Sequence, residues 1–126
     1  MTKNITYEFV HASKVTPLEK RFFKKLRIKD VGLIWDEFVA HQKDKKCYIV
    51  VAKNSRKTPI GWSLLFYDQC DRKWTFSLYV KVGYRRKGIG TKIYRKMLRT
   101  MKLSDKRVHV YRHDTRSTGF YDKVTS

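Results

Sequence analysis

The sequence predicts an α+β domain in which strands and helices share one hydrophobic core. Apolar residues recur at helical spacing between residues 18 and 42 and at strand spacing between residues 47 and 82. The residues Thr16-Pro17-Leu18-Glu19 form a capping box with proline at the first helical position. This motif predicts the start of a helix. A glycine segment at 83–90 joins a strand pattern to a helix pattern. The chain of 126 residues fits one domain, so we predict a single unit over 1–126.

The N-terminal part is expected to form a strand and a pair of helices. Residues 5–10 alternate as a strand does, and a helix follows from the capping box. This first helix is predicted to bury one apolar side, made of Leu18, Phe22, Phe23 and Leu26. A second helix is predicted over 30–42.

The remaining chain is expected to alternate strands with two helices. The strand patterns fall at 47–53, 59–67, 74–82 and 107–112. The first three strands form an antiparallel meander, because short turns separate them. Helices are predicted over 91–102 and 118–124.

The glycine segment has the composition of a phosphate-binding loop. A Walker A motif fails because Ile89 stands where its lysine belongs, and a dinucleotide-binding motif fails because Ile93 replaces its third glycine. The pattern R-x-x-G-x-G fits, through Arg85, Gly88 and Gly90. Glycines let the backbone approach a phosphate, and the N–H groups of a helix start point at the anion.

At these residues the sequence resembles the GNAT superfamily of N-acetyltransferases, whose Q/R-x-x-G-x-G/A pattern binds the pyrophosphate of acetyl-CoA. The resemblance covers nearly the whole chain, including a glycine just inside the third strand, here Gly61. Two departures are Val82, where proline is frequent, and Arg86, where glycine is frequent. The resemblance implies a GNAT fold: three α/β/α layers around a mixed sheet, truncated at the C-terminus after a fourth helix. It implies acetyl-CoA as co-substrate.

The resemblance also assigns roles to individual residues. Tyr121 matches the family's general acid, which protonates the departing sulfur, although packing of the last helix is the alternative role. Asp114 stands seven residues before it, where the family often has asparagine. Backbone N–H groups of the fourth strand bind the oxyanion in the family. The cofactor-binding residues implied are Leu78, Tyr79, Val80, Arg85, Arg86, Lys87, Gly88, Ile89, Gly90, Thr91 and Asp114.

The proton acceptor for the attacking amine stays open. A lysine-type amine near pKa 10.4 must lose a proton before it attacks, yet the strand at 74–82 has no carboxylate. The candidates are Asp36, Glu37, His41 and Asp68. The alternative for each of them is an ordinary solvated charge on the surface. A proton exit through water is an equal alternative.

The sequence argues against a metal, a catalytic cysteine and a membrane span. Cys47 and Cys70 are too far apart for a CxxC pair, and the four histidines include no HExxH. We expect Cys47 to be a core residue. No apolar run approaches the roughly 18 residues of a spanning helix, and no secretory leader is evident. These features predict a cytoplasmic protein without a bound metal.

The charge points to an acidic partner. The formal net charge is +19, and residues 81–112 alone hold 12 Lys and Arg against one acid. Such a chain repels small polycations and attracts amines on RNA or on an acidic protein surface. The predicted acceptor is therefore a primary amine on an acidic macromolecule. A catalytically inactive protein of the same fold, binding nucleic acid or a partner protein, is the alternative function.

The sequence also suggests a homodimer. The family continues after its last helix with two strands that this sequence lacks. The strand at 107–112 would keep one unpaired edge, which a second copy of the same strand could cover. An open edge that a large substrate completes is the alternative.

Overall fold

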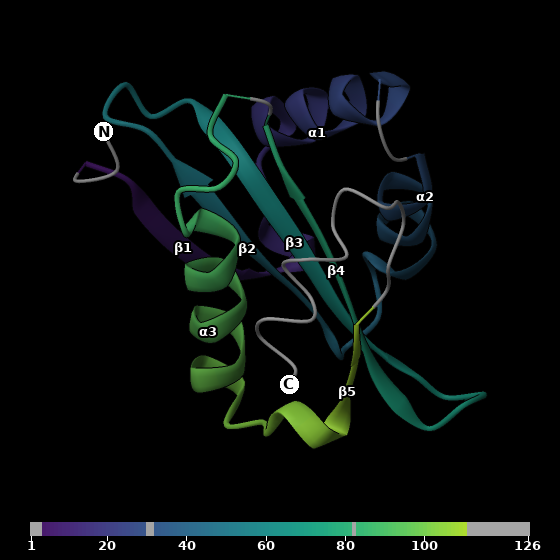
Figure 1. Cartoon of the computed structure of the whole chain (residues 1–126). Coiled ribbons are helices and arrows are strands. Elements are labelled where there is room, and N and C mark those ends of the chain that lie inside the picture. The colour runs from purple at the N-terminus through teal and green to yellow at the C-terminus, as the bar shows by residue number, and fades with distance from the viewer. Residues whose placement is uncertain (1–3, 30–31, 82, 111–126) are drawn as a thin grey trace.

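The computed structural model describes residues 4–29, 32–81 and 83–110. Within these residues a five-stranded sheet is flanked by three α-helices (Figure 1). The strands and helices are, in chain order, β1 (Thr6–His11), α1 (Pro17–Lys29), α2 (Gly32–His41), β2 (Cys47–Lys53), β3 (Pro59–Asp68), β4 (Lys73–Val80), α3 (Ile89–Met101) and β5 (Val108–Val110). Two 3₁₀ turns, Ala12–Lys14 and Asp105–Arg107, precede α1 and β5.

The sheet is mixed, as predicted. Its strand order follows the chain from β1 to β5, with antiparallel pairs from β1 to β4. β5 lies parallel to β4, and α3 makes the crossover that a parallel connection requires. The short β2–β3 and β3–β4 turns confirm the antiparallel meander.

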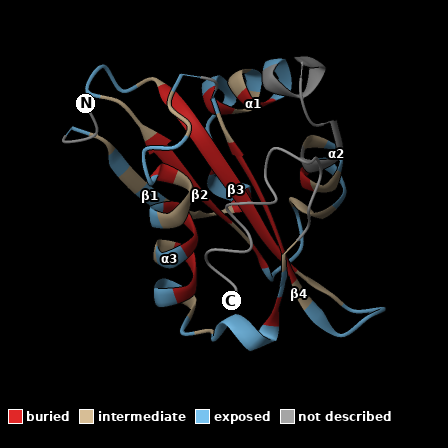
Figure 2. Ribbon diagram, in the orientation of Figure 1, coloured by how far each residue is buried: buried red, intermediate tan, exposed pale blue. Residues whose placement is uncertain are grey.

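Helices cover both faces of the sheet, which confirms the three-layer α/β/α prediction. α1 and α2 contact each other and cover one face, where Phe23 of α1 stacks on Trp62 of β3 at 4.1 Å between ring centroids. α3 covers the other face with Ile93, Tyr94 and Met97. Figure 2 shows the buried residues concentrated along β2, β3 and β4 and on the sheet-facing side of α3.

Gly61 favours the close packing of α3. A Cβ on Gly61 would lie 3.1 Å from the Tyr79 carbonyl oxygen and 3.3 Å from Cδ1 of Ile93. Contacts that short require the neighbouring atoms to shift by a few tenths of an ångström. The glycine therefore lets α3 approach the sheet next to the C-terminal end of β4.

The capping box of α1 is confirmed, but the predicted buried side of this helix is partly wrong. The Thr16 N–H donates to Glu19 Oε1 at 3.0 Å, and the Glu19 N–H donates to Thr16 Oγ1 at 3.2 Å. Leu18 is 69% exposed, whereas Glu19 is buried. Glu19 occupies the inner side of the first turn because its carboxylate closes the capping box and also binds Lys53.

Several predicted boundaries shift by a few residues. β2 has the predicted limits, but β4 ends at Val80 instead of residue 82. α3 begins at Ile89, two residues earlier than predicted, because Gly88 already supplies the turn that starts the helix. The helix predicted at 118–124 lies outside the described residues.

The strand predicted at 107–112 is shorter in its described part. Arg107 belongs to the 3₁₀ turn, whose hydrogen bond to Ser104 keeps it out of the sheet. Val108, His109 and Val110 pair with β4, and among described residues no other strand pairs with them. The homodimer through this strand stays a prediction.

Candidate functional site

The glycine segment is a tight turn between β4 and α3. Gly83 and Gly88 have positive φ values of 98° and 79°, and Arg86 between them has a φ of 62°. Glycine adopts such angles without steric cost, so Gly83 and Gly88 explain why this sequence turns here. The Tyr84 N–H donates to the Lys81 carbonyl at 2.9 Å and closes the first part of the turn.

The start of α3 presents backbone N–H groups without a capping side chain. Gly88 is the N-cap residue and has no side chain to bind them. The first helical hydrogen bond runs from the Lys92 N–H to the Gly88 carbonyl at 3.1 Å. The N–H groups of Ile89, Gly90 and Thr91 precede that bond, and the first turn holds no acidic residue. This is the arrangement that binds phosphate groups.

Arg85 bends back over the end of β4. Its Nε donates to the Val80 carbonyl at 2.6 Å, and its guanidinium lies 5.3 Å from the ring centroid of Tyr79. These contacts hold the positive charge close to the strand end. Arg86 and Lys87 are exposed on the same turn.

The pairing of β4 identifies which of its backbone groups face the β5 side. The Lys81 N–H donates to the Ile60 carbonyl at 2.8 Å, so residue 81 faces β3. Hydrogen-bonded positions alternate along an antiparallel strand. The backbone groups of Val80 and Leu78 must therefore point to the opposite edge, which agrees with the Arg85 bond to the Val80 carbonyl.

That edge of β4 is open in the described part of the chain. The pairing with β5 reaches only Phe76, opposite Val110. Beyond Phe76, β4 continues to Val80, and no described strand pairs with it along this edge. The Leu78 and Val80 N–H groups face this opening, and the opening leads to Arg85 and the glycine turn. The sequence could not exclude the Tyr79 N–H, because that choice depends on the register with β3.

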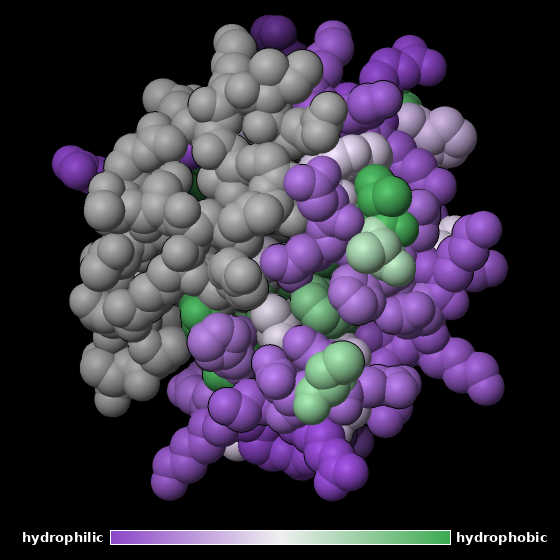
Figure 3. Space-filling view, turned by 90° about the vertical axis from the view of Figure 1, so that its right-hand side faces the viewer, coloured by the Kyte–Doolittle hydropathy of each residue, from purple (hydrophilic) through white to green (hydrophobic). Residues whose placement is uncertain are grey.

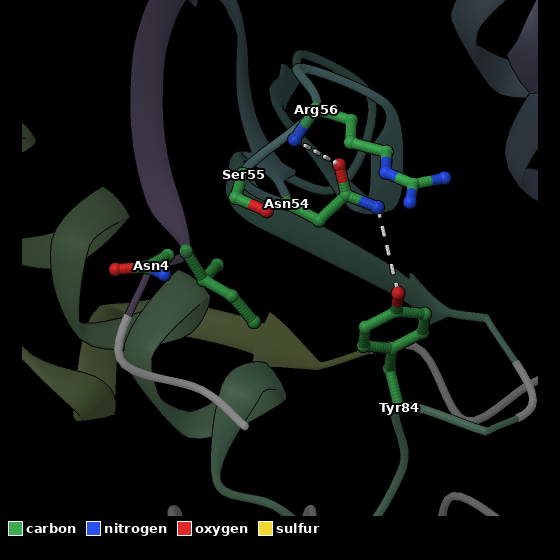
Figure 4. Close-up of a pocket in the computed structure, with 6 residues that line it drawn as sticks. Asn4, Asn54, Ser55, Arg56 and Tyr84 are labelled. Atoms are coloured by element: carbon green, nitrogen blue, oxygen red, sulfur yellow. Dashed lines mark hydrogen bonds between the residues drawn. The ribbon is translucent and has the colours of Figure 1, made fainter.

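A shallow pocket lies beside the glycine turn but includes none of the predicted cofactor-binding residues. It has a volume of about 380 Å³ and is lined by Asn4, Ile5, Asn54, Ser55, Arg56 and Tyr84 (Figure 4). Asn54 Nδ2 donates to the Tyr84 hydroxyl at 3.4 Å. This bond ties the glycine turn to the β2–β3 turn.

Exposed basic residues lie on α3, which follows the glycine turn, and on α1. Lys92, Arg95 and Arg99 are exposed on α3, and Lys24 and Lys25 are exposed on α1. None of these five has an ion pair with a described carboxylate. Figure 3 shows one side of the molecule, where the described surface is mainly hydrophilic and hydrophobic residues are scattered. The charge is therefore displayed to solvent instead of being neutralised locally.

The four candidate proton acceptors differ in burial. Asp36 is exposed, and Asp68 is half-buried at the end of β3, where its carboxylate accepts from the Cys70 N–H at 2.9 Å. His41 stacks on Phe66, and its Nδ1 lies 2.8 Å from Asp44 Oδ2. Glu37 is half-buried on α2, with one carboxylate oxygen fully enclosed. Tyr121 and Asp114 lie outside the described residues.

Among the described residues, neither a reactive cysteine nor a cluster of metal ligands forms a second candidate site. Cys47 is fully buried, as predicted, and burial raises the pKa of its thiol to about 12, with a smaller contribution from Asp44. In the described ranges no group of three His, Cys, Asp or Glu residues is placed to hold a metal ion. No helix in those ranges is long and apolar enough to span a membrane.

Comparison with solved structures finds the same fold in several acetyltransferases. A candidate acetyltransferase from Deinococcus radiodurans is 18% identical with a TM-score of 0.66, covering 100% of this chain and 84% of that one. The ribosomal-protein-alanine N-acetyltransferase of Brucella melitensis is 11% identical with a TM-score of 0.64, covering 97% and 92%. An aminoglycoside acetyltransferase from an uncultured soil sample, in complex with sisomicin, is 16% identical with a TM-score of 0.60, covering 97% and 88%.

Sequence comparison agrees with the fold. No curated protein sequence matches the chain significantly. The profile of the acetyltransferase (GNAT) family, in contrast, matches residues 12–125, which is nearly the entire chain. The strand, the glycine turn and the helix described above all lie inside the matched region, and the chain belongs to the GNAT family of acetyltransferases.

Proposed function

We propose that this chain transfers an acetyl group from acetyl-CoA to a primary amine on an acidic macromolecule. The observation that carries the proposal is the edge of β4 beyond Phe76, along which no strand of the described residues pairs and which runs directly into the R-x-x-G-x-G turn. Acetyl-CoA supplies an activated acetyl thioester. The protein supplies a phosphate site at one end of this opening and a backbone hydrogen-bond donor in its middle.

The residues of the turn fit a pyrophosphate. The N–H groups of Ile89, Gly90 and Thr91 would bind phosphate oxygens, since no side chain caps them. Arg85, Arg86 and Lys87 add positive charge on the same turn. We assign these residues, with Gly88, to cofactor binding.

The open edge of β4 fits the acyl end of the same molecule. The Leu78 N–H faces the opening, so it can donate to the oxygen that becomes negative when the amine attacks. Its position is fixed by the sheet before substrate binds, which is what makes such a donor effective. Tyr79 and Val80 border the same opening, next to Arg85.

Tyr121 is proposed as the acid that protonates the departing thiolate, and Asp114 as part of the cofactor site. The phenol, with an ordinary pKa near 10, can transfer a proton to a thiolate whose conjugate acid has a pKa near 8.5 once both are shielded from water. Tyr121→Phe should lower kcat by about 100-fold and leave the KM for acetyl-CoA unchanged, because only a transition-state proton is removed.

Tyr67→Phe is the matched control, because it removes a phenol hydroxyl from the far end of β3. Steady-state kinetics with varied acetyl-CoA measures both parameters. If Tyr121→Phe and Tyr67→Phe have the same kcat, Tyr121 packs the last helix and does not act as the acid.

The acceptor is proposed from the electrostatics. The net charge of +19 and the exposed cations on α1 and α3 attract negative surfaces and repel polycations. The similar Brucella enzyme is named for acetylating ribosomal-protein alanine, an amine carried by a macromolecule, whereas the soil enzyme binds sisomicin, a small polycation. The charge of this chain favours the first kind of acceptor.

The proposal is tested with three amines and radiolabelled acetyl-CoA. Two peptides of equal length carry a single lysine, one among aspartates and glutamates and the other among arginines, and sisomicin is the third amine. At low salt we expect kcat/KM for the acidic peptide to exceed the others by at least about tenfold, with the difference shrinking in high salt.

A double variant, Lys24→Glu with Lys25→Glu, removes two exposed cations outside the glycine turn and should reduce the preference. Equal rates for the two peptides would contradict the acidic acceptor. Acetylation of none of the three amines would contradict the acetyl transfer itself.

A further inference from the structure

A row of aromatic side chains crosses four strands on the face of the sheet that α3 covers. His11 lies opposite Tyr48 in the β1–β2 ladder, and Tyr67 lies opposite Trp74 in the β3–β4 ladder. Tyr48 lies opposite Leu65, two residues before Tyr67, so both pairs are on one face. We call the following residues the aromatic row: Phe9 and His11 of β1, Tyr48 of β2, Tyr67 of β3 and Trp74 of β4.

Ring contacts join the aromatic row into one cluster. The rings of Phe9 and Tyr48 stack at 5.5 Å between centroids, and the His11 ring meets the Tyr48 ring edge to face at 5.4 Å. The Trp74 ring lies 6.5 Å from that of Tyr48 and meets the Tyr67 ring edge to face at 5.4 Å. Cross-strand aromatic pairs stabilise a sheet, so folding alone explains such contacts. Exposure and charge distinguish this row from an ordinary set of pairs.

The aromatic row lies where the cover of the sheet by α3 ends. Along β2, Val50 is fully buried and Tyr48 is half-buried. Along β4, Phe76 is fully buried and Trp74 is half-buried. The other three members of the row are half-buried as well. Figure 1 shows the β3–β4 hairpin projecting at the lower right, away from α1, α2 and α3. The rings are therefore partly open to solvent.

Cations flank the aromatic row on three segments of the chain. Lys46 Nζ lies 4.8 Å from the centroid of the Tyr67 ring. Arg107 directly precedes Val108, which pairs with Trp74. The exposed cations of the segments 43–46, 68–73 and 105–107 are Lys43, Lys45, Lys46, Arg72, Lys73, Lys106 and Arg107. A ligand that contacts the rings is thus met by positive charge on several sides.

Acidic residues of the same three segments offset only part of this charge. The segments hold seven Lys and Arg against four Asp. Asp44 binds His41, with 2.8 Å between Oδ2 and Nδ1. Asp68 accepts from the Cys70 N–H of its own turn at 2.9 Å. Two of the four carboxylates are therefore engaged within the protein, and the surface around the row stays positive.

Planar rings beside cations have the chemistry that binds single-stranded nucleic acid. Bases stack on aromatic side chains while phosphates pair with Lys and Arg, and such binding tolerates different base sequences. A duplex keeps its base faces covered, and an acidic protein offers charge without base faces, so neither makes use of the rings. We propose that the aromatic row and its flanking cations bind single-stranded nucleic acid.

This surface is separate from the glycine turn. Trp74 and Val80 lie six residues apart on β4, which corresponds to about 20 Å along an extended strand. Arg85 and the glycine turn follow the Val80 end of the strand. A nucleic acid can therefore bind without occupying the proposed cofactor site. Its binding does not depend on acetyl transfer and is measured without acetyl-CoA.

The first test compares strands with and without bases. The probes are fluorescein-labelled single strands of about 12 nucleotides, within the usual site size: oligo(U), oligo(dT) and an abasic DNA strand. At low salt we expect fluorescence anisotropy to show oligo(U) and oligo(dT) binding at least about tenfold more tightly than the abasic strand. The ratio of the first two affinities shows whether RNA or DNA is preferred. Equal affinity for the abasic strand would overturn the proposal, because phosphates alone would then account for binding.

Trp74→Leu and Tyr48→Leu remove rings without changing the charge. Each should weaken oligo(dT) binding by at least about fivefold, because the stacking on one ring is lost. Trp74→Phe keeps a ring and should recover most of the affinity. Trp35→Leu is the matched control, since it removes a half-buried tryptophan from α2 on the opposite face. Thermal melting verifies that each variant is folded. An equal loss in Trp35→Leu, or wild-type affinity in both row variants, would contradict the proposed surface.

Tryptophan fluorescence locates the contact. A base stacked on an indole ring quenches its emission, and Trp74→Phe leaves only Trp35 and Trp62 to emit. We expect oligo(dT) to quench the wild type but not Trp74→Phe, although anisotropy still shows that this variant binds. Equal quenching of the two proteins would place the contact away from the aromatic row and overturn the proposal.

The dependence on salt tests the flanking cations. Lys46→Gln combined with Lys73→Gln should reduce the slope of log affinity against log salt by about one, because each phosphate contact with a single strand contributes about 0.7. The matched control is Lys24→Gln with Lys25→Gln, which removes two exposed cations from α1 and should leave the slope unchanged. Equal slopes for the two double variants would show that only the overall charge attracts the strand, against the proposal.

Competition identifies the other class of partner. Polyglutamate of matching length carries charge without bases, so it should displace labelled oligo(dT) at least about tenfold less effectively than unlabelled oligo(dT) does. Equal displacement would assign the surface to acidic proteins and overturn the proposal. No acetyl transfer occurs in these measurements. A negative result here leaves the proposed function standing, and an absence of turnover leaves this surface standing.

Discussion

Gly90→Glu is expected to abolish acetyl-CoA binding while making the protein no less stable. Gly90 is the second residue of α3, and its N–H is one of the three that precede the first helical bond. Side chains on a helix lean toward its N-terminus, so the new carboxylate would lie over these N–H groups. It would occupy the phosphate position and repel the phosphates, which we expect to weaken binding by at least about 100-fold.

The fold should tolerate this change for two reasons. Gly90 does not have the positive φ that Gly83 and Gly88 show, so a side chain brings no backbone strain. A glutamate in the first turn also interacts favourably with the helix dipole, by about 0.3–1 kcal/mol. Gly88→Glu would be a poorer test, because the φ of 79° at Gly88 penalises any side chain and would mix strain with the loss of the site.

Gly90→Ala is the matched control, since the family pattern accepts alanine at this position. Calorimetric titration with acetyl-CoA, combined with thermal melting, separates binding from stability. Wild-type affinity in Gly90→Glu would show that the phosphates bind elsewhere. Equal loss in Gly90→Ala would show that close backbone approach matters more than charge.

The sequence predicted well those features of the fold that depend on residues close together in the chain. The capping box of α1, the limits of β2 and the glycine turn depend on residues within a few positions of each other, and all three are confirmed. Gly88, with a φ of 79°, is the residue at which α3 starts. The early start of α3 shows the limit of spacing alone, because Ile89 belongs to the buried side of the helix.

Features that depend on distant residues could not be predicted. The exposure of Leu18 follows from the inward position of Glu19, which depends on Lys53 in β2. The direction of the Leu78 N–H follows from the register of β4 on β3. The partial burial of Glu37 requires α2 to lie against β3, which the sequence alone does not show.

Lys53→Met is expected to destabilise the protein strongly at neutral pH. Lys53 Nζ binds Glu19 Oε2 at 2.9 Å and Glu8 Oε1 at 3.0 Å, and thereby joins the end of β2 to α1 and β1. Glu19 is buried and cannot turn to solvent without opening its capping box. Removing the cation from such a pair costs about 3 kcal/mol, which lowers the Tm of a domain this size by roughly 10 °C.

The pH dependence identifies the cause. In the wild type the bonds from Thr16 and Lys53 hold the pKa of Glu19 below its ordinary value despite burial. The ionised carboxylate therefore adds stability above its unfolded pKa, and this stability is lost as the pH falls through the folded pKa. Without Lys53, burial favours the protonated form. The stability difference between wild type and Lys53→Met should thus be largest near pH 7 and should shrink as the pH falls below about 4.

Urea unfolding at a series of pH values measures this difference, and Lys53→Met combined with Glu19→Gln is its control. The double variant keeps the capping box and carries no buried charge, so it should recover most of the stability lost at pH 7. A constant difference across pH would instead assign the loss to the packing of the lysine side chain.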